Sequence, residues 1–158
     1  LSFLDEDDRL AILDGIRYHN KKEIPLDIRR SSLEMARLIR DADKLDVFEV
    51  VQRYLDEGRI RELLPRIPEK WEIGDGVLDS LMETGRASYS QVRSVGDFLM
   101  IQLSWIFDMN YPPSFRSVLE RNVIERIESR LPLEHRVRTI IEKARTFARS
   151  SAAEGEMG

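Results

Sequence analysis

A short charged run in the second quarter of the chain is the strongest candidate for chemistry. Residues 40–46, RDADKLD, combine three aspartates with two cations. On a helix, residues three apart are neighbours, so Arg40 would reach Asp43 and Lys44 would reach Asp41. Such ion pairs are typical of a solvated helix face. Asp43, however, lies between apolar positions, where a carboxylate should have a cation or a metal ion beside it.

The second candidate is a histidine. His19 and His135 are the only two in the chain, and His135, among charged neighbours, is predicted to be a surface residue. His19 is expected at the end of a helix, where the helix dipole favours it as a simple cap. The alternative is a ligand, because imidazole with carboxylate suits manganese, iron, nickel or zinc. His19 and Asp43 alone would not complete a site, since a bound metal generally needs three or more protein ligands.

Two predicted helices must position these residues. The first runs from Asp5, which can cap it, to about Asn20, with a buried stripe that includes Leu10, Leu13 and Ile16.

The second predicted helix is the longest. It covers about residues 32–57, begins at a capping box of Ser31 and Glu34, and is closed by Gly58. Its apolar residues recur every three positions through Ala42 and Leu45, which predicts a core helix.

The remaining segments are also predicted to be helical. They are a short turn near 59–64 and helices over 75–84, about 90–110, about 115–131 and about 132–150. Gly85 is expected to end the first of these helices, Ser114 to cap the third, and Pro132 to lie at the start of the last. Neither a strand of useful length nor a repeat is evident. The predicted class is all-α, with a disordered tail at 151–158.

Composition excludes several kinds of protein. The 158 residues contain no cysteine, which excludes a disulfide framework, a thiolate zinc site and a cysteine nucleophile, and suits the cytoplasm. The 25 basic and 29 acidic residues give a net charge of −4 and argue against a nucleic-acid surface. No apolar run is long enough to cross a membrane. Association of copies of the chain is left open.

Several stretches resemble a known family. Residues 16–20 (IRYHN), 24–25 (IP) and 36–46 (ARLIRDADKLD) look like the second half of a bacterial HD-domain metal-dependent phosphohydrolase. Residues 96–98 (GDF) and 103–110 (LSWIFDMN) resemble the C-terminal part of one branch of that family.

The resemblance implies a helical bundle of the HD-domain type that binds one or two divalent metals: manganese, iron, nickel, zinc or magnesium. It implies His19 and Asp43 as metal ligands and hydrolysis of a small phosphorylated substrate. Asn20 and Lys44 would face the substrate phosphate. The groups expected to orient the ligands are Arg40, Asp41 and Asp46.

The chain departs from the family in lacking its first histidine and its His-Asp doublet. Because the chain opens at Leu1 without a methionine, we expect both elements upstream; the alternative is a degenerate domain that no longer binds metal. Residues 1–64 are then the C-terminal portion of an HD-like domain, and residues 65–150 are a helical extension packed on it.

A different class of function is also compatible with the sequence. The long amphipathic helices and an aromatic group could form a non-catalytic interaction module, with a docking patch made of Trp105, Phe107, Tyr111 and Phe115. Ordinary core packing explains the same aromatic residues.

Overall fold

The structure is a computed structural model that describes residues 3–21 and 23–154. Within these residues all regular structure is helical, which confirms the all-α class. The α-helices and 3₁₀ helices are α1 (Glu6–Tyr18), α2 (Arg30–Asp56), α3 (Ile60–Leu63), α4 (Asp75–Thr84), η1 (Tyr89–Gln91), α5 (Val95–Ser104), η2 (Trp105–Asp108), α6 (Pro112–Glu120), α7 (Val123–Glu128) and α8 (His135–Ala153).

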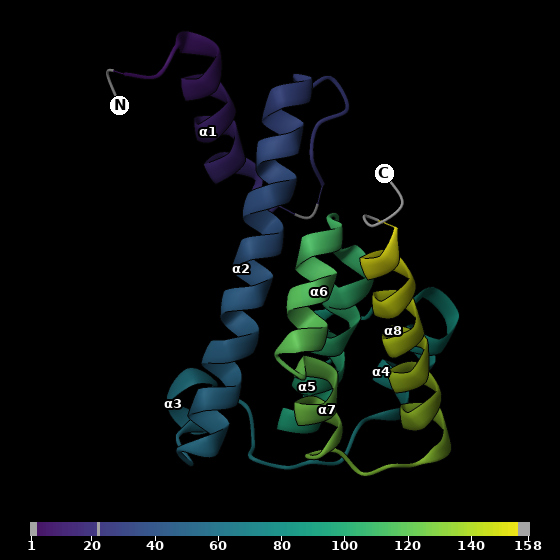
Figure 1. Cartoon of the computed structure of the whole chain (residues 1–158). Helices are drawn as coiled ribbons and strands as arrows, with labels where there is room; N and C mark the ends of the chain where they lie inside the picture. Colours follow the sequence, from purple (N-terminus) through teal and green to yellow (C-terminus); the bar gives the residue numbers. More distant parts are fainter. Residues whose placement is uncertain (1–2, 22, 155–158) are drawn as a thin grey trace.

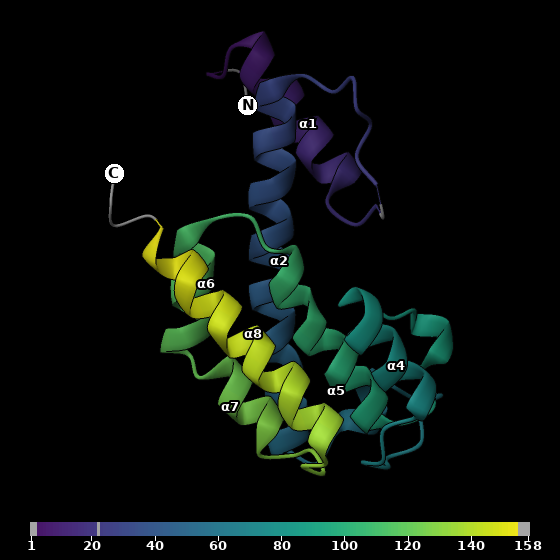
Figure 2. The same ribbon diagram turned by 90° about the vertical axis from the view of Figure 1, so that its right-hand side faces the viewer.

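The long helix α2 connects two parts of the molecule. Figure 1 shows α1 beside the first half of α2, beyond the other helices, and the bundle of α4 to α8 beside its second half. In Figure 2, α8 crosses the front of this bundle, with α6 and α7 on one side and α5 and α4 on the other. Over the described residues, no helix has the length and apolar character that a membrane crossing requires.

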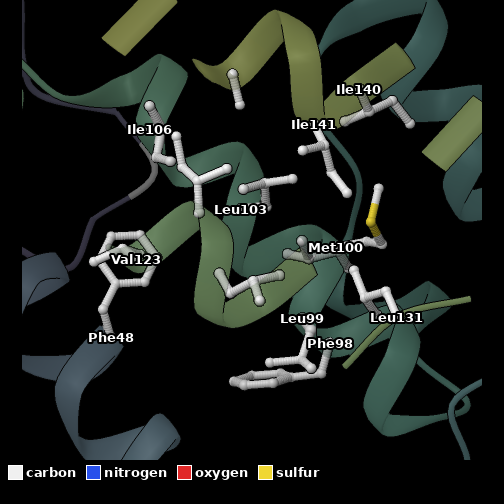
Figure 3. Close-up of a cluster of buried hydrophobic side chains, with 14 of the residues drawn as sticks. Phe48, Phe98, Leu99, Met100, Leu103, Ile106, Val123, Leu131, Ile140 and Ile141 are labelled. Carbon is white, nitrogen blue, oxygen red and sulfur yellow. The ribbon is translucent and has the colours of Figure 1, made fainter. Parts of the chain in front are cut away.

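Helix α5 is the centre of the core. All ten of its residues are buried, from Val95 to Ser104. Figure 3 shows Leu99, Met100 and Leu103 of this helix among Ile140 and Ile141 of α8. The second half of α2 belongs to the same cluster of buried hydrophobic side chains, through Phe48, Val51 and Leu55. The bundle and the second half of α2 therefore share one hydrophobic core.

Helix α1 has its expected cap but not its expected face. Asp5 accepts a hydrogen bond from the Asp8 N–H at 2.8 Å, as predicted. The predicted buried stripe is wrong, because Leu13 and Ile16 are each 56% exposed. Ala11 and Gly15 are the buried residues instead. Their small size lets α1 approach α2 closely, and a β-carbon at Gly15 would lie 2.8 Å from Ile39.

Helix α2 begins earlier than predicted and without the capping box. Its first residue is Arg30, and no side chain caps the start of the helix. Glu34 instead accepts from Arg30 in an exposed ion pair. The end of the helix is as predicted, since Gly58 follows it with a left-handed φ of 66°, which glycine adopts without steric cost.

The helix predicted over residues 115–131 is two helices. Asn122 has a φ of 51° and separates α6 from α7. The start at Ser114 is wrong as well, because α6 begins at Pro112, and proline suits a first helical turn that lacks an acceptor for its N–H.

Helix α8 ends later than expected. It continues through Ala153, into the stretch predicted to be a disordered tail. Residues 155–158 of that tail lie outside the described residues.

Candidate functional site

The aspartate that the fold buries in the charged run of α2 is Asp41. It is 1% exposed. Its carboxylate accepts from the backbone N–H of Asn110 at 3.0 and 3.1 Å, from the Asn110 side-chain amide at 2.9 Å and from the Tyr111 N–H at 3.1 Å. These donors lie immediately before α6. Asp41 of α2 therefore accepts hydrogen bonds from backbone N–H groups at the start of α6, although the two helices are far apart in the sequence.

Two cations of the same run converge on Asp108, at the end of η2. Lys44 Nζ donates to the Asp108 carboxylate and to its backbone carbonyl, both at 2.9 Å. Arg40 donates to the same carboxylate oxygen at 3.2 Å. The predicted pairs of Arg40 with Asp43 and of Lys44 with Asp41 are therefore wrong. We define the contact of Arg40, Asp41 and Lys44 with residues 108–111 as the α2 junction.

Asp43 and Asp46 lie outside these contacts. Both are exposed, and so is Ala42, which the sequence pattern placed in the buried stripe. The Asp43 carboxylate lies close enough to Tyr89 to affect its ionisation. The pKa of Tyr89 is raised mainly by desolvation of its hydroxyl, with a further contribution from the charge of Asp43. Asp43 is thus an exposed carboxylate next to the α2 junction.

His19 forms the C-cap of α1 and is half-buried. Its ring Nδ1 lies 2.7 Å from the carbonyl oxygen of Ile16. A carbonyl can only accept, so Nδ1 donates and Nε2 of the neutral ring carries the lone pair. Metal-binding histidines commonly have this arrangement. Asn20 follows in an exposed turn.

The packing of α1 on α2 places His19 near the segment of α2 that precedes Asp43. Helices α1 and α2 run in the same direction, because residues further along α1 contact residues further along α2. Asp7 pairs with Arg29 at 2.8 Å, and Ser32 donates to Asp14 at 2.7 Å. Gly15 then packs against Ile39. One turn further along α1 is His19, so the end of α1 lies near Ile39 in the first half of α2 (Figure 1), and Asp43 follows Ile39 by one further turn of α2.

The ligand set is incomplete in the described part of the chain. There, no hydrogen bond or ion pair joins His19 to Asp43, and no group of three or more histidines and carboxylates could hold a metal ion. The donor types suit a divalent transition metal, but their number does not complete a coordination shell.

Two hollows lie elsewhere on the surface. A shallow groove of about 820 Å³ follows α8, and Phe107, Arg138, Lys143 and Phe147 are among its lining residues. A second hollow, of about 580 Å³, lies at the connection after α1 and is lined by Tyr18, Lys21, Glu23, Ile24, Pro25 and Leu26. Neither contains the predicted ligands.

Sequence analysis assigned no role to Asp108, Asn110 or Arg86. Asp108 and Asn110 lie 64 to 69 positions from their α2 partners, and helical periodicity carries no information over that separation. In the sequence, the stretch 103–110 contributes to a predicted helix, to the family resemblance and to the aromatic group, and none of these indicates a contact with α2. Arg86, after α4, also approaches Asp108, at 3.6 Å.

Comparison of the chain with family models, with curated proteins and with solved structures found no match. The functional assignment therefore depends on the residues and geometry described above.

Proposed function

We propose that this chain is part of an HD-type metal-dependent phosphohydrolase, in which His19 and Asp43 are two of the metal ligands. The observation that carries the proposal is the state of His19. Its Nδ1 donates to a backbone carbonyl, so Nε2 is left to bind a metal, at the end of the helix that packs on the α2 segment preceding Asp43.

The surroundings of Asp43 support the same proposal. Asp43 is exposed, whereas its neighbours Asp41 and Lys44 bind residues 108–111 and fix the position of this part of α2. The chemistry that a metal would supply here is activation of water and neutralisation of phosphoryl charge. The rest of the ligand set would come from residues other than those the structure describes.

Binding of Mn²⁺ tests this proposal. Calorimetry of the chain together with the segment that supplies the remaining ligands should show an Mn²⁺ affinity that falls at least about tenfold in His19→Ala and in Asp43→Asn, because each variant removes one ligand. His135→Ala and Glu83→Gln are the controls, since they replace an exposed imidazole and an exposed carboxylate elsewhere in the chain. Phosphate release from p-nitrophenyl phosphate by a metal-loaded preparation should fall in the same two variants. Unchanged Mn²⁺ affinity in both would contradict the assignment.

A non-catalytic interaction module, or a degenerate HD domain, is the second candidate. The specific observation in its favour is that α1, α2 and the connection between them leave large apolar side chains exposed. Leu26 is 105% exposed, Leu13 and Ile16 are 56% exposed and Leu38 is 53% exposed. Exposed apolar side chains mark an interaction site where they form one contiguous patch. A chain that binds no Mn²⁺ but associates through these residues would support this candidate.

A further inference from the structure

We infer that Arg86, Arg40 and Lys44 form a binding site for a phosphate dianion, in which the carboxylate of Asp108 occupies part of the anion position. The cations come from two separate parts of the chain. Arg40 and Lys44 lie on α2, and Arg86 follows α4. All three approach the same carboxylate, at distances of 3.2, 2.9 and 3.6 Å.

Three cations contact one carboxylate at this cluster, that of Asp108. In the described residues the other carboxylates of this α2 segment do not pair with these cations: the buried Asp41 accepts from Asn110 and Tyr111, and Asp43 is exposed. Like charges held this close repel one another, more strongly at a partly desolvated site than in water. An anion that contacts all three cations directly would reduce this repulsion.

The cluster also has donors to offer and an opening to solvent. The side chains of Lys44 and Arg40 are only 12% and 17% exposed, so the fold holds them in place. Those of Asp108 and Arg86 are 39% and 75% exposed. In the described part of the chain Arg40 uses only its Nη2 in a side-chain hydrogen bond, and Arg86 contacts Asp108 at a distance longer than a hydrogen bond.

Phosphate is the anion that this donor set fits. Guanidinium groups present planar pairs of N–H donors that match two phosphate oxygens, and lysine adds a compact charge. The inference rests on the proposed function for the nature of the ligand, which would be the phosphoryl group of the substrate. It extends that site to Arg86, from the C-terminal half of the chain. Binding of free phosphate does not require a metal, so the two proposals can fail separately.

Titration of inorganic phosphate into the metal-free chain at constant ionic strength, followed by NMR of the arginine side chains, tests the site. Wild-type protein should show shifts at Arg86 and Arg40. Asp108→Asn should bind phosphate about fivefold more tightly, because it removes one negative charge from the anion position. The substitution keeps the backbone carbonyl of residue 108, which also accepts from Lys44. A purely structural role of Asp108 would not raise the affinity.

Arg86→Ala should weaken phosphate binding about fivefold. The Arg86 side chain is exposed, so its removal should not unfold the protein. Loss of folding would therefore not explain weaker phosphate binding. Arg66→Ala is the matched control, since Arg66 is an exposed arginine of another loop. Equal phosphate affinity in wild type, Asp108→Asn and Arg86→Ala would overturn the inference, and so would the absence of phosphate binding by both wild type and Asp108→Asn.

Discussion

Replacement of Asp41 by alanine is expected to lower the free energy of unfolding by about 3 kcal/mol. The carboxylate is 1% exposed and accepts from the backbone of Asn110, from its side chain and from the backbone of Tyr111. Without Asp41 these donors lose their acceptor at a partly buried position. There each unsatisfied group costs about 1–3 kcal/mol, and entering water recovers part of the loss. Guanidinium chloride unfolding measures the change.

Asp46→Ala is the matched control for this substitution, because Asp46 is an exposed aspartate of the same helix. Its effect should be within about 0.5 kcal/mol. Amide hydrogen exchange adds a local readout: the Asn110 and Tyr111 N–H groups should lose protection in Asp41→Ala more than amides in the centre of α5. Equal stability of Asp41→Ala and Asp46→Ala would show that the α2 junction does not hold the two parts of the chain together.

Replacement of Gly96 by alanine is expected to destabilise the bundle by about 3 kcal/mol. Gly96 lies in the first turn of α5, where its N–H donates to the Lys70 carbonyl at 3.1 Å. A β-carbon there would lie 2.2 Å from the Trp71 carbonyl oxygen and 3.0 Å from that of Glu72. Backbone atoms cannot rotate away as a side chain can, so the loop must move. Thermal unfolding measures the loss.

The loop in contact with Gly96 has little freedom to move. The Gly74 N–H donates to the buried Asp97 carboxylate at 2.7 Å, and the Ser94 hydroxyl donates to the Glu72 carbonyl at 2.6 Å. Gly76→Ala is the control, since a β-carbon there would make only an ordinary 3.6 Å contact with Gln91. That variant should be neutral or more stable by up to about 1 kcal/mol. A Gly96→Ala protein as stable as Gly76→Ala would contradict the packing described for α5.

Local signals in the sequence predicted several elements accurately. Asp5 caps α1, Gly58 follows α2, and the predicted helix over 75–84 with Gly85 after it matches α4. These features depend on residues within one turn of each other, where the chemistry of caps and left-handed glycine decides the outcome.

The failures have two causes, contacts between distant segments and a local backbone conformation that residue spacing does not indicate. The stripe of Leu13 and Ile16 has helical spacing, but the close approach of α2 selected the small residues Ala11 and Gly15 for the interface. At the break between α6 and α7, Asn122 has a left-handed backbone conformation, which asparagine tolerates better than most residues. The spacing of apolar residues does not predict this conformation.

The candidate site was only partly predictable because it depends on contacts between distant segments. The sequence identified the charged run of α2 but not which of its members would be buried. Residues 108–111 determine which members are buried. The backbone N–H groups of Asn110 and Tyr111 donate to Asp41, and the Asp108 carboxylate accepts from Lys44 and Arg40. Asp43 and His19 remain the predicted metal ligands, and their assignment stays a prediction.

Paramagnetic NMR with Mn²⁺ tests most directly whether His19 and Asp43 bind one metal together. Millimolar Mn²⁺ added to the isotope-labelled chain should broaden the His19 imidazole and Asp43 amide signals at the same concentrations, and Asp43→Asn should remove the broadening at His19. The contradicting result would be broadening at His19 that is unchanged in Asp43→Asn, or broadening confined to the exposed acidic first turn of α1, at Glu6, Asp7 and Asp8.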